Sequence, residues 1–460
     1  GPMENRVRFL HEALEAVKKR FGKSFIVELC VAGEQPNGYV GGAKGYTLED
    51  TIEFAKCIED VADILQLREC DMTKSHPTGF TFRKGEHETI RYSQAIKAAG
   101  CKILTEPVGG FQDPEEINAY IKEGKCDMIG MARAFMCDPE YGKKLYEGRG
   151  EDITPCLRCN KCHGRGANDP FVSVCSVNPC IGLEQKVARM QVPTKGGKRV
   201  AIIGGGPVAM RCAMYPQDRG HTPVIYEKGP QLGGAIIHAD YAEFKWPLRD
   251  FKNFLIHQMD KRGIAVHLNT EATPEMIKAE NYDVVIAATG ANPMVLPIPG
   301  ADPEKLFFAQ ETFAHPEKLG ENVVVIGGGE VGVEIGIYLS RKGHKASVLE
   351  MRDRLAADST AIHYYSMLEE AWEAEPNFTG ITGARVAAIK DGAVEYIDKD
   401  GNTQSVPADS VVMSAGMRPN KDLALSFYGC AKEFYMIGDC KKAATIQQGM
   451  RSAYATAMRI

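Results

Sequence analysis

Short apolar runs alternate with amphipathic stretches along the first 155 residues of the chain. An apolar run of about four to eight residues is typical of a buried strand, and apolar residues at three- and four-residue intervals are typical of a helix with one buried face. This alternation predicts consecutive strand–helix units and a parallel sheet, preceded by one extra helix over residues 4–21. The expected strands are "SFIVELCV", "DILQLR", "KILTEPVGG" and "CDMIGMAR", and the helices after them are "TLEDTIEFAKCIEDV", "HETIRYSQAIKAAG", "DPEEINAYIKEG" and "DPEYGKKLYEG".

Four strands are half of the number that closes a parallel strand–helix barrel. On their own they would leave a large apolar concave face in water. Three explanations stay open: the missing half lies on another chain, the sequence begins partway through a longer polypeptide, or four strands adopt a different closed arrangement. We favour the second. Residues 1–155 are then the C-terminal part of a (β/α)8 barrel.

Four cysteines follow this segment, and the first three are spaced Cys-x2-Cys-x2-Cys. Such a triplet places three thiolates on one tight turn, and a fourth thiolate a short loop away completes the set that holds a cubane iron–sulfur cluster. Zinc is the main alternative, although its thiolates usually come in two separated pairs. Disulfides are disfavoured because the chain is far larger than the small secreted scaffolds that depend on them, which indicates a reducing compartment. The predicted ligands are Cys156, Cys159, Cys162 and Cys175.

A first glycine-rich turn comes after the apolar run "RVAII". Gly204 and Gly206 permit a tight turn and the close approach of a pyrophosphate, and the small Ala209 lets the following helix pack on the strand. A second strand, "TPVIY", ends at Glu227, whose carboxylate can accept hydrogen bonds from the hydroxyls of a ribose. Alone, such a motif is weak.

The same pattern occurs again, with Gly327, Gly329 and Gly332 in the turn and Glu350 as the acid. Two independent strand–turn–helix–strand–acid units make a coincidence improbable, so both are predicted to bind dinucleotides. Two further strand ends add cofactor candidates: "YDVVIAATG" ends at Gly290, and "EFYMIGDC" places Gly438 and Asp439 after a short apolar strand.

Composition narrows the class of protein. A chain of 460 residues allows about three domains. A net charge of −5 without blocks of Lys or Arg gives no indication of nucleic acid or an acidic membrane surface. No apolar stretch is long enough to cross a bilayer, and no charged-then-apolar leader opens the chain. These features predict a cytoplasmic enzyme.

The two glycine-rich units resemble the flavoproteins with two dinucleotide-binding domains. In that family the first domain holds FAD, the second is inserted into it and holds NAD(P)H, and a late Gly-Asp closes over the flavin. The resemblance implies nicotinamide-nucleotide contacts from the second turn and from Glu350, whose charge would repel a ribose 2′-phosphate and favour NADH. Arg352 and Arg354 could nevertheless accommodate NADPH. For FAD it implies Gly204, Gly206, Glu227 and Asp439, with Ala209, Gly234, Gly290 and Gly438 as further cofactor-binding candidates.

With the cysteines in front, the chain resembles the enoate reductase, 2,4-dienoyl-CoA reductase and trimethylamine dehydrogenase family within the old-yellow-enzyme superfamily. The resemblance rests on "ENRVRF", "DMIGMARAFMCDP" and the cysteine block, and its motifs run over essentially the whole chain. It implies four segments: a partial barrel over 1–155, a cluster segment over 156–195, an FAD domain over 196–316 plus 405–460, and an NAD(P)H domain over 317–404.

The family also implies an FMN site on the barrel. Gly109, Gly110, Ala132 and Arg133 match its phosphate-binding loops at the carboxyl ends of barrel strands. His76 falls near the position of an active-site histidine in the dienoyl-CoA reductases, although a solvated loop histidine is the plainer interpretation. Many relatives carry an arginine on the first strand seen here, where this chain has Cys30, and that departure puts the usual flavin contact in doubt.

The function implied by the resemblance is an electron relay from NADH to FAD, to a 4Fe-4S cluster and to FMN, which reduces the C=C bond of an enoate, enone or enoyl-CoA. Two alternatives stay open: an amine or other substrate dehydrogenase of the same family, and an NADH-oxidising electron-transfer module that serves a partner protein. The expected partners are a small unsaturated substrate and a second copy of the chain in a homo-oligomer. Another chain or segment that completes the barrel is a further candidate partner.

Overall fold

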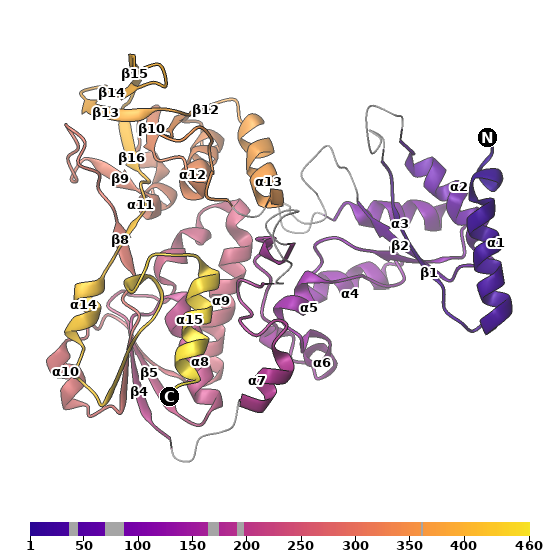
Figure 1. Cartoon of the computed structure of the whole chain (residues 1–460), viewed down its shortest axis with the longest axis horizontal. Helices are drawn as coiled ribbons and strands as arrows, with labels where there is room; N and C mark the ends of the chain where they lie inside the picture. The colour runs from indigo at the N-terminus through magenta and orange to yellow at the C-terminus, as the bar shows by residue number, and fades with distance from the viewer. Residues whose placement is uncertain (36–44, 70–86, 164–173, 191–196, 360–361) are drawn as a thin grey trace. The chain divides into compact units, whose positions relative to one another are not determined.

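The chain forms two compact units, Gly1–Asn160 and Lys161–Ile460, in a mixed α/β fold (Figure 1). A computed structural model describes residues 1–35, 45–69, 87–163, 174–190, 197–359 and 362–460. In the first unit, strands alternate with helices as the hydrophobic pattern predicts. Its elements are α1 (Met3–Phe21), β1 (Glu28–Ala32), α2 (Leu48–Ile58), β2 (Ile64–Arg68), α3 (Thr89–Ala98), β3 (Leu104–Pro107), α4 (Pro114–Lys122), α5 (Arg133–Cys137) and α6 (Tyr141–Tyr146), with a 3-10 turn η1 (Gly150–Asp152).

Strands β1, β2 and β3 pair in parallel in that order. The prediction of a fourth strand, "CDMIGMAR", is wrong for the described structure, because this segment contributes a single parallel bridge between Val108 and Gly130. The N–H of Gly130 still donates to the carbonyl of Pro107 at 3.1 Å, so the segment runs along β3. It stays short because helix α5, which the sequence did not predict, begins at Arg133. Closure into a barrel remains a prediction.

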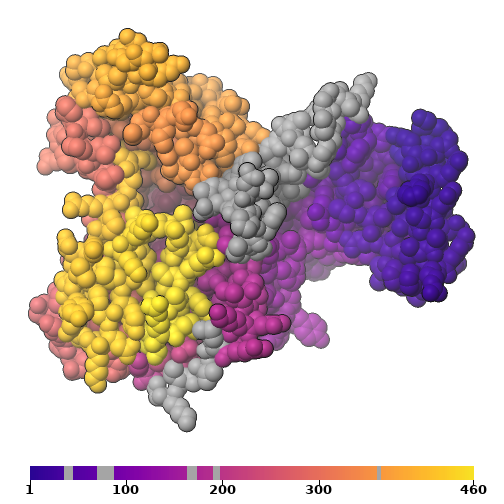
Figure 2. Space-filling view, in the orientation of Figure 1, coloured from indigo at the N-terminus to yellow at the C-terminus, as the bar shows by residue number. Residues whose placement is uncertain are grey.

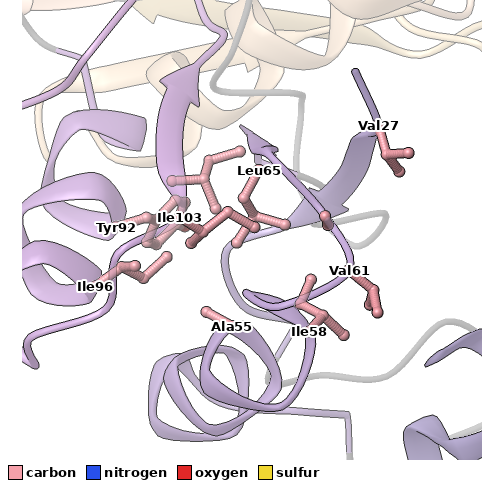
Figure 3. Close-up of a cluster of buried hydrophobic side chains, with 10 residues drawn as sticks. Val27, Ala55, Ile58, Val61, Leu65, Tyr92, Ile96 and Ile103 are labelled. Atoms are coloured by element: carbon pink, nitrogen blue, oxygen red, sulfur yellow. The ribbon is translucent and has the colours of Figure 1, made fainter. Parts of the chain in front are cut away.

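The core of the first unit lies between the sheet and helices α2 and α3 (Figure 3). Alternate residues of β2 share one face, and residues three or four apart share one face of each helix, so each element presents an apolar face to the others. The side chains that are at most 1% exposed are Ala55, Ile58, Leu65, Leu67, Tyr92 and Ile96. Helix α2 starts with a capping box, in which the Thr47 hydroxyl and the Asp50 carboxylate satisfy each other's backbone N–H groups.

The second unit contains two parallel five-stranded sheets. The first has the order β18-β7-β4-β5-β6. Helices α8, α9 and α15 pack together beside it (Figure 1), and Figure 2 shows C-terminal residues, in yellow, on the visible face of this unit. Its elements are β4 (Arg199–Ile203), α8 (Pro207–Asp218), β5 (Thr222–Tyr226), α9 (Trp246–Lys261), β6 (Ala265–His267), α10 (Pro274–Ala279), β7 (Val284–Ala287), α14 (Lys421–Ser426), β18 (Glu433–Met436) and α15 (Ile446–Ala457), with 3-10 turns η3 (Gly234–Asp240), η4 (Glu243–Lys245) and η6 (Gly438–Cys440).

The second sheet has the order β12-β11-β10-β16-β9 and adjoins an antiparallel sheet β13-β14-β15. Strands β9 and β16 lie outside the predicted segment 317–404, so this sheet reaches beyond it. Its elements are β9 (Leu306–Phe308), α11 (Ala309–Ala314), η5 (Pro316–Lys318), β10 (Asn322–Ile326), α12 (Glu330–Arg341), β11 (Lys345–Leu349), α13 (Ile362–Glu373), β12 (Phe378–Ile381), β13 (Arg385–Lys390), β14 (Ala393–Ile397), β15 (Thr403–Pro407) and β16 (Ser410–Met413).

Two short strands, β8 (Ala291–Pro293) and β17 (Met417–Pro419), pair antiparallel where the chain leaves the first sheet and returns to it. The second sheet is therefore inserted into the connections of the first, as the two-domain resemblance implied. The cysteine segment contains η2 (Lys161–His163) and α7 (Glu184–Met190). None of the described helices is both long and apolar enough to cross a membrane.

Candidate functional site

The first glycine-rich turn lies at the carboxyl end of β4. Gly204 has φ +111°, and a Cβ there would collide with the carbonyl of Ala288, so the position requires glycine. Glu227 follows β5 directly, and its carboxylate accepts hydrogen bonds from the N–H groups of Gly205 and Gly229, each at 2.6 Å. The acid predicted to bind a ribose is thus fixed beside the turn.

Small residues bring three segments together around this turn. Ala209 is fully buried in the first turns of α8. A Cβ on Gly234, which has φ +51°, would lie 2.9 Å from the Cα of Gly206, so the loop before η3 approaches the turn closely. All of these residues lie at the carboxyl edge of a parallel sheet, where α/β domains bind nucleotides.

The ends of β7 and β18 supply the remaining predicted residues of this edge. Gly290 has φ +68° and Gly438 has φ +66°, both in the left-handed region that favours glycine. The carboxylate of Asp439 accepts a hydrogen bond from the N–H of Ala444 at 3.2 Å. Burial raises the pKa of Asp439. The structure therefore brings the candidate FAD residues to one edge, and their contact with FAD remains a prediction.

The second glycine-rich turn repeats this geometry at the end of β10. Gly327 has φ +106°, and a Cβ on Gly332 would collide with the carbonyl of Gly327, which explains why the third position is glycine here and alanine in the first turn. A Cβ on Gly329 would lie 3.0 Å from the carboxylate of Asp358. Glu350 accepts a hydrogen bond from the N–H of Gly328 at 2.9 Å.

The arginines beside this turn are engaged by groups of the protein itself. The side chain of Arg352 donates to Glu350 at 3.1 Å and to Asp358 at 2.6 Å. The guanidinium of Arg354 lies over the ring of Tyr365, 4.5 Å from its centroid. Both arginines are thus held by contacts other than an incoming phosphate.

A buried polar network connects the two sheets of the second unit, and the sequence prediction missed it. Lys245, at the end of η4, forms an ion pair with Glu334 of α12, and the two side chains are 5% and 8% exposed. The hydroxyl of Tyr364 donates to the same glutamate at 2.5 Å. His238 stacks on Phe313 with ring centroids 5.3 Å apart. A charged residue in the otherwise apolar run "VGVEIGIYL" was the available signal.

The predicted FMN phosphate loops lie in the first unit. Gly110 has φ +70°, and its carbonyl accepts a hydrogen bond from the guanidinium of Arg158. Arg133, which follows Ala132 at the start of α5, donates to the side-chain oxygen of Asn160 at 2.6 Å. Two guanidinium groups and a left-handed glycine suit a phosphate, so these residues fit the group that the family implies.

Gly109 is held by a buried histidine. One ring nitrogen of His87 lies 2.9 Å from the carbonyl of Gly109, and the other lies 2.9 Å from the carboxylate of Glu116. The His87 side chain is 1% exposed and stacks on Phe111. Burial raises the pKa of Glu116, but the hydrogen bond and charge of His87, the hydrogen bond of Tyr120 and the charge of Arg158 together outweigh burial and leave this pKa below its usual value. His76 lies outside the described residues.

The cysteine block spans the boundary of the two units, with Cys156 and Cys159 in the first and Cys162 and Cys175 in the second. None of the described cysteines forms a disulfide, and the described residues assemble no group of three or more potential metal ligands. The cluster ligands therefore remain a prediction, with zinc as the alternative.

Local features of the block fit thiolate ligation. The N–H of Arg158 donates to the sulfur of Cys156, and that of Asn178 donates to the sulfur of Cys175, each at 3.4 Å. Such N–H···S bonds tune iron–sulfur centres. A hydrogen bond with Cys137 and the charge of Arg133 lower the pKa of Cys156.

Comparison with known proteins matches both units. The model of the pyridine nucleotide-disulphide oxidoreductase family matches residues 198–455, and that of the NADH:flavin oxidoreductase / NADH oxidase family matches residues 1–152. Bilirubin reductase of Mediterraneibacter gnavus is 31% identical over 463 residues, which cover 99% of this chain and 71% of that protein. Cinnamate reductase of Clostridium sporogenes is 30% identical over 483 residues, covering 100% of this chain and 70% of that protein.

A solved structure shows the same fold. The complex of 2-naphthoyl-CoA reductase with 2-naphthoyl-CoA has a TM-score of 0.90 and 29% sequence identity, and the match covers 100% of this chain and 69% of that chain. The structure of histamine dehydrogenase from Rhizobium sp. 4-9 has a TM-score of 0.83 at 22% identity, over 100% of this chain and 71% of that chain.

Proposed function

Because the chain belongs to the NADH:flavin oxidoreductase / NADH oxidase family of old-yellow-enzyme-like oxidoreductases, we propose that it reduces the C=C bond of an α,β-unsaturated acid, ketone or acyl-CoA with NADH. The proposal includes FAD, FMN and a 4Fe-4S cluster as resident cofactors. The chain is an oxidoreductase, and the proposal concerns its substrate class and electron path.

One observation carries the substrate class. Cinnamate reductase and 2-naphthoyl-CoA reductase each match the chain over its full length. The compounds in their names both hold a carbon–carbon π bond conjugated to a carboxyl or thioester carbonyl. Such conjugation makes the β-carbon electron-poor and open to hydride transfer from a reduced flavin. A C=C bond conjugated to the carbonyl of an acid, ketone or thioester is therefore the substrate feature we propose.

The chain's own residues would hold the cofactors at three places. The turn at Gly204 with Glu227 would hold FAD, and the turn at Gly327 with Glu350 would hold NADH. Arg133 and Gly110 would hold the FMN phosphate. When bound, these cofactors and the cluster supply the transfer of electrons from NADH to the alkene.

The engaged state of Arg352 supports NADH over NADPH. Its guanidinium is shared by Glu350 and Asp358, so binding a ribose 2′-phosphate would require breaking charge-assisted hydrogen bonds. Glu350 also adds a negative charge at the position where the 2′-phosphate would lie. Both effects disfavour NADPH.

The test is anaerobic turnover of NADH with cinnamate, measured as loss of cinnamate and gain of its saturated product by chromatography. The full chain should consume both compounds in equal amounts. The Cys159→Ser variant should keep NADH-dependent reduction of ferricyanide, because that step needs only FAD, and should lose cinnamate reduction. The control is Cys430→Ser, a buried cysteine of the first sheet's core that should keep both activities.

Other outcomes of this test would contradict the proposal. Cinnamate reduction that survives Cys159→Ser would exclude the cysteine block from the electron path. Ferricyanide reduction with no loss of cinnamate, 2-enoates or enones would identify an electron-transfer module. Oxidation of dimethylamine with release of electrons to ferricyanide would identify an amine dehydrogenase.

A further inference from the structure

Two hydrogen bonds join the cysteine turn to the predicted FMN phosphate loops within the first unit. The guanidinium of Arg158 donates to the carbonyl of Gly110, and Arg133 donates to the side chain of Asn160 at 2.6 Å. Arg158 lies between Cys156 and Cys159, and Asn160 comes directly after Cys159. Each link therefore starts within one or two residues of a predicted cluster ligand and ends on a predicted phosphate loop.

The two side chains of the cysteine turn that make these hydrogen bonds are buried. Arg158 is 5% exposed and Asn160 is 3% exposed. Water does not readily replace a hydrogen bond that a buried polar side chain loses, so displacing the turn carries an energetic cost. A change in the position of the cysteine turn must therefore alter the contacts of Gly110 and Arg133.

The backbone of the turn points to the same conclusion. Arg158 and Asn160 both have φ +52°. This left-handed conformation is uncommon for asparagine and more so for arginine, so contacts must hold it in place. The N–H of Arg158 donates to the sulfur of Cys156 while its guanidinium binds Gly110. One residue thus contacts a predicted ligand sulfur at one end and the phosphate loop at the other.

The loop is also contacted by His87, a residue outside the cysteine turn. His87 contacts the carbonyl of Gly109 and the carboxylate of Glu116, and its ring stacks on Phe111. The phosphate loop is therefore contacted by Arg158 of the cysteine turn and by His87 from outside that turn. The charge of Arg158 also acts on Glu116, the partner of His87, so a His87 variant serves as a comparison for the size of the effect.

We propose that Arg158 and Asn160 are positioning residues that couple cluster binding to FMN binding. This proposal rests on the proposed function, because it requires FMN and a cluster at these sites. Once the cluster fixes the cysteines, the turn holds Gly110 and Arg133 in the arrangement that accepts the FMN phosphate. By thermodynamic linkage, FMN must then stabilise the cluster by the same factor.

The test measures the dissociation constant of FMN for the full chain in cluster-loaded and cluster-free forms, using quenching of flavin fluorescence. Couplings between sites commonly change affinity about 5–150-fold. The wild-type chain should bind FMN at least about fivefold more tightly when loaded. Arg158→Met should bring the ratio of the two constants close to one while iron and sulfide content are retained.

Two further variants keep the test decisive. Asn160→Gly tolerates the left-handed backbone but removes the acceptor of Arg133, so it should also reduce the ratio. His87→Gln should weaken FMN binding in both forms and change the ratio less than Arg158→Met does. As a second readout, FMN should slow the loss of the cluster's visible absorbance in the wild-type chain but not in Arg158→Met.

Three results would overturn the proposal. If the wild-type chain binds FMN with the same dissociation constant in both forms, the two sites are not coupled. The proposed function would still stand. An unchanged ratio in both Arg158→Met and Asn160→Gly would show that other residues carry the coupling. Failure of the wild-type chain to bind FMN in either form would contradict the proposed function and this proposal together.

Discussion

A single carboxylate lies at each of the two predicted nucleotide-binding edges of the second unit. Glu227 and Glu350 each follow the strand next to a glycine-rich turn, and each accepts a hydrogen bond from a turn N–H. The charge is thus already oriented before any nucleotide arrives, which lowers the cost of ordering it on binding. For single residues, the charge and burial of the side chain determine how a substitution changes binding or stability.

The first prediction concerns Glu350. Glu350→Gln keeps an acceptor for the N–H of Gly328 but removes the charge that repels a 2′-phosphate. The preference for NADH over NADPH, measured as the ratio of kcat/KM values with ferricyanide, should fall about tenfold, which corresponds to about 1.4 kcal/mol. Glu227→Gln is the control and should leave this ratio unchanged. Equal use of NADH and NADPH by the wild-type chain would contradict the role of Glu350.

The second prediction concerns the pH dependence of stability. Burial and the nearby Lys245 lower the pKa of His238 to about 4, below its unfolded value of about 6.5. The unfolded chain therefore binds the proton first, so the stability contributed by neutral His238 is complete above about pH 6.5 and declines as the pH falls to about 4. The melting temperature should fall between pH 7 and pH 5, and less so in His238→Gln. An identical fall in both proteins would show that His238 does not titrate in this way.

Whole elements are joined by the ion pair between Lys245 and Glu334. It connects η4 beside the first sheet to α12, the helix that starts at the second glycine-rich turn. A buried pair of this kind adds little stability over apolar packing, but loss of one partner leaves the other charge buried alone. The pair therefore selects one relative placement of the two elements.

The third prediction compares the loss of one partner of this ion pair with the loss of both. Glu334→Gln should destabilise the protein by about 3–5 kcal/mol, because Lys245 loses its counter-charge. The double variant Lys245→Met with Glu334→Leu should recover most of this loss. Thermal unfolding followed by circular dichroism measures both effects. A single variant as stable as wild type would mean that water or another group compensates Lys245.

The fourth prediction compares the two helices that follow the turns. A Cβ on Gly332 would collide with the carbonyl of Gly327, so Gly332→Ala should weaken NADH binding and cost about 1–3 kcal/mol of stability. Ala209→Gly at the matching position of α8 should cost about 1 kcal/mol through helix propensity alone. Isothermal titration with NADH separates the two. Undiminished NADH affinity in Gly332→Ala would argue against a nucleotide at this turn.

At the scale of the whole molecule, local patterns were predictable and long-range ones were not. Both nucleotide-type domains could be predicted because a turn such as Gly204–Gly206 and its acid lie within about twenty residues of each other. The strand predicted around Met128 became a single bridge, because the sequence does not show that Arg133 starts a helix. The partners Lys245 and Glu334 lie 89 residues apart, beyond any local pattern.

The long-range contacts of the cysteine block also could not be predicted from the sequence. Its spacing predicts a cluster, but the contacts of Arg158 and Asn160 with the phosphate loops depend on residues 48 and 27 positions away. Neither side chain carries a sequence signal of that role. The proposed relay requires that FAD, FMN and the cluster are all bound at the same time.

The most direct test of the relay is the cofactor content of the anaerobically purified chain. FMN and FAD are separated by chromatography, and iron, zinc and labile sulfide are assayed per chain. We predict equal amounts of FMN and FAD with about four irons and four sulfides per chain. FAD and iron without FMN would mean that the chain is only an NADH-oxidising electron-transfer protein. Zinc in place of iron would contradict the proposed relay altogether.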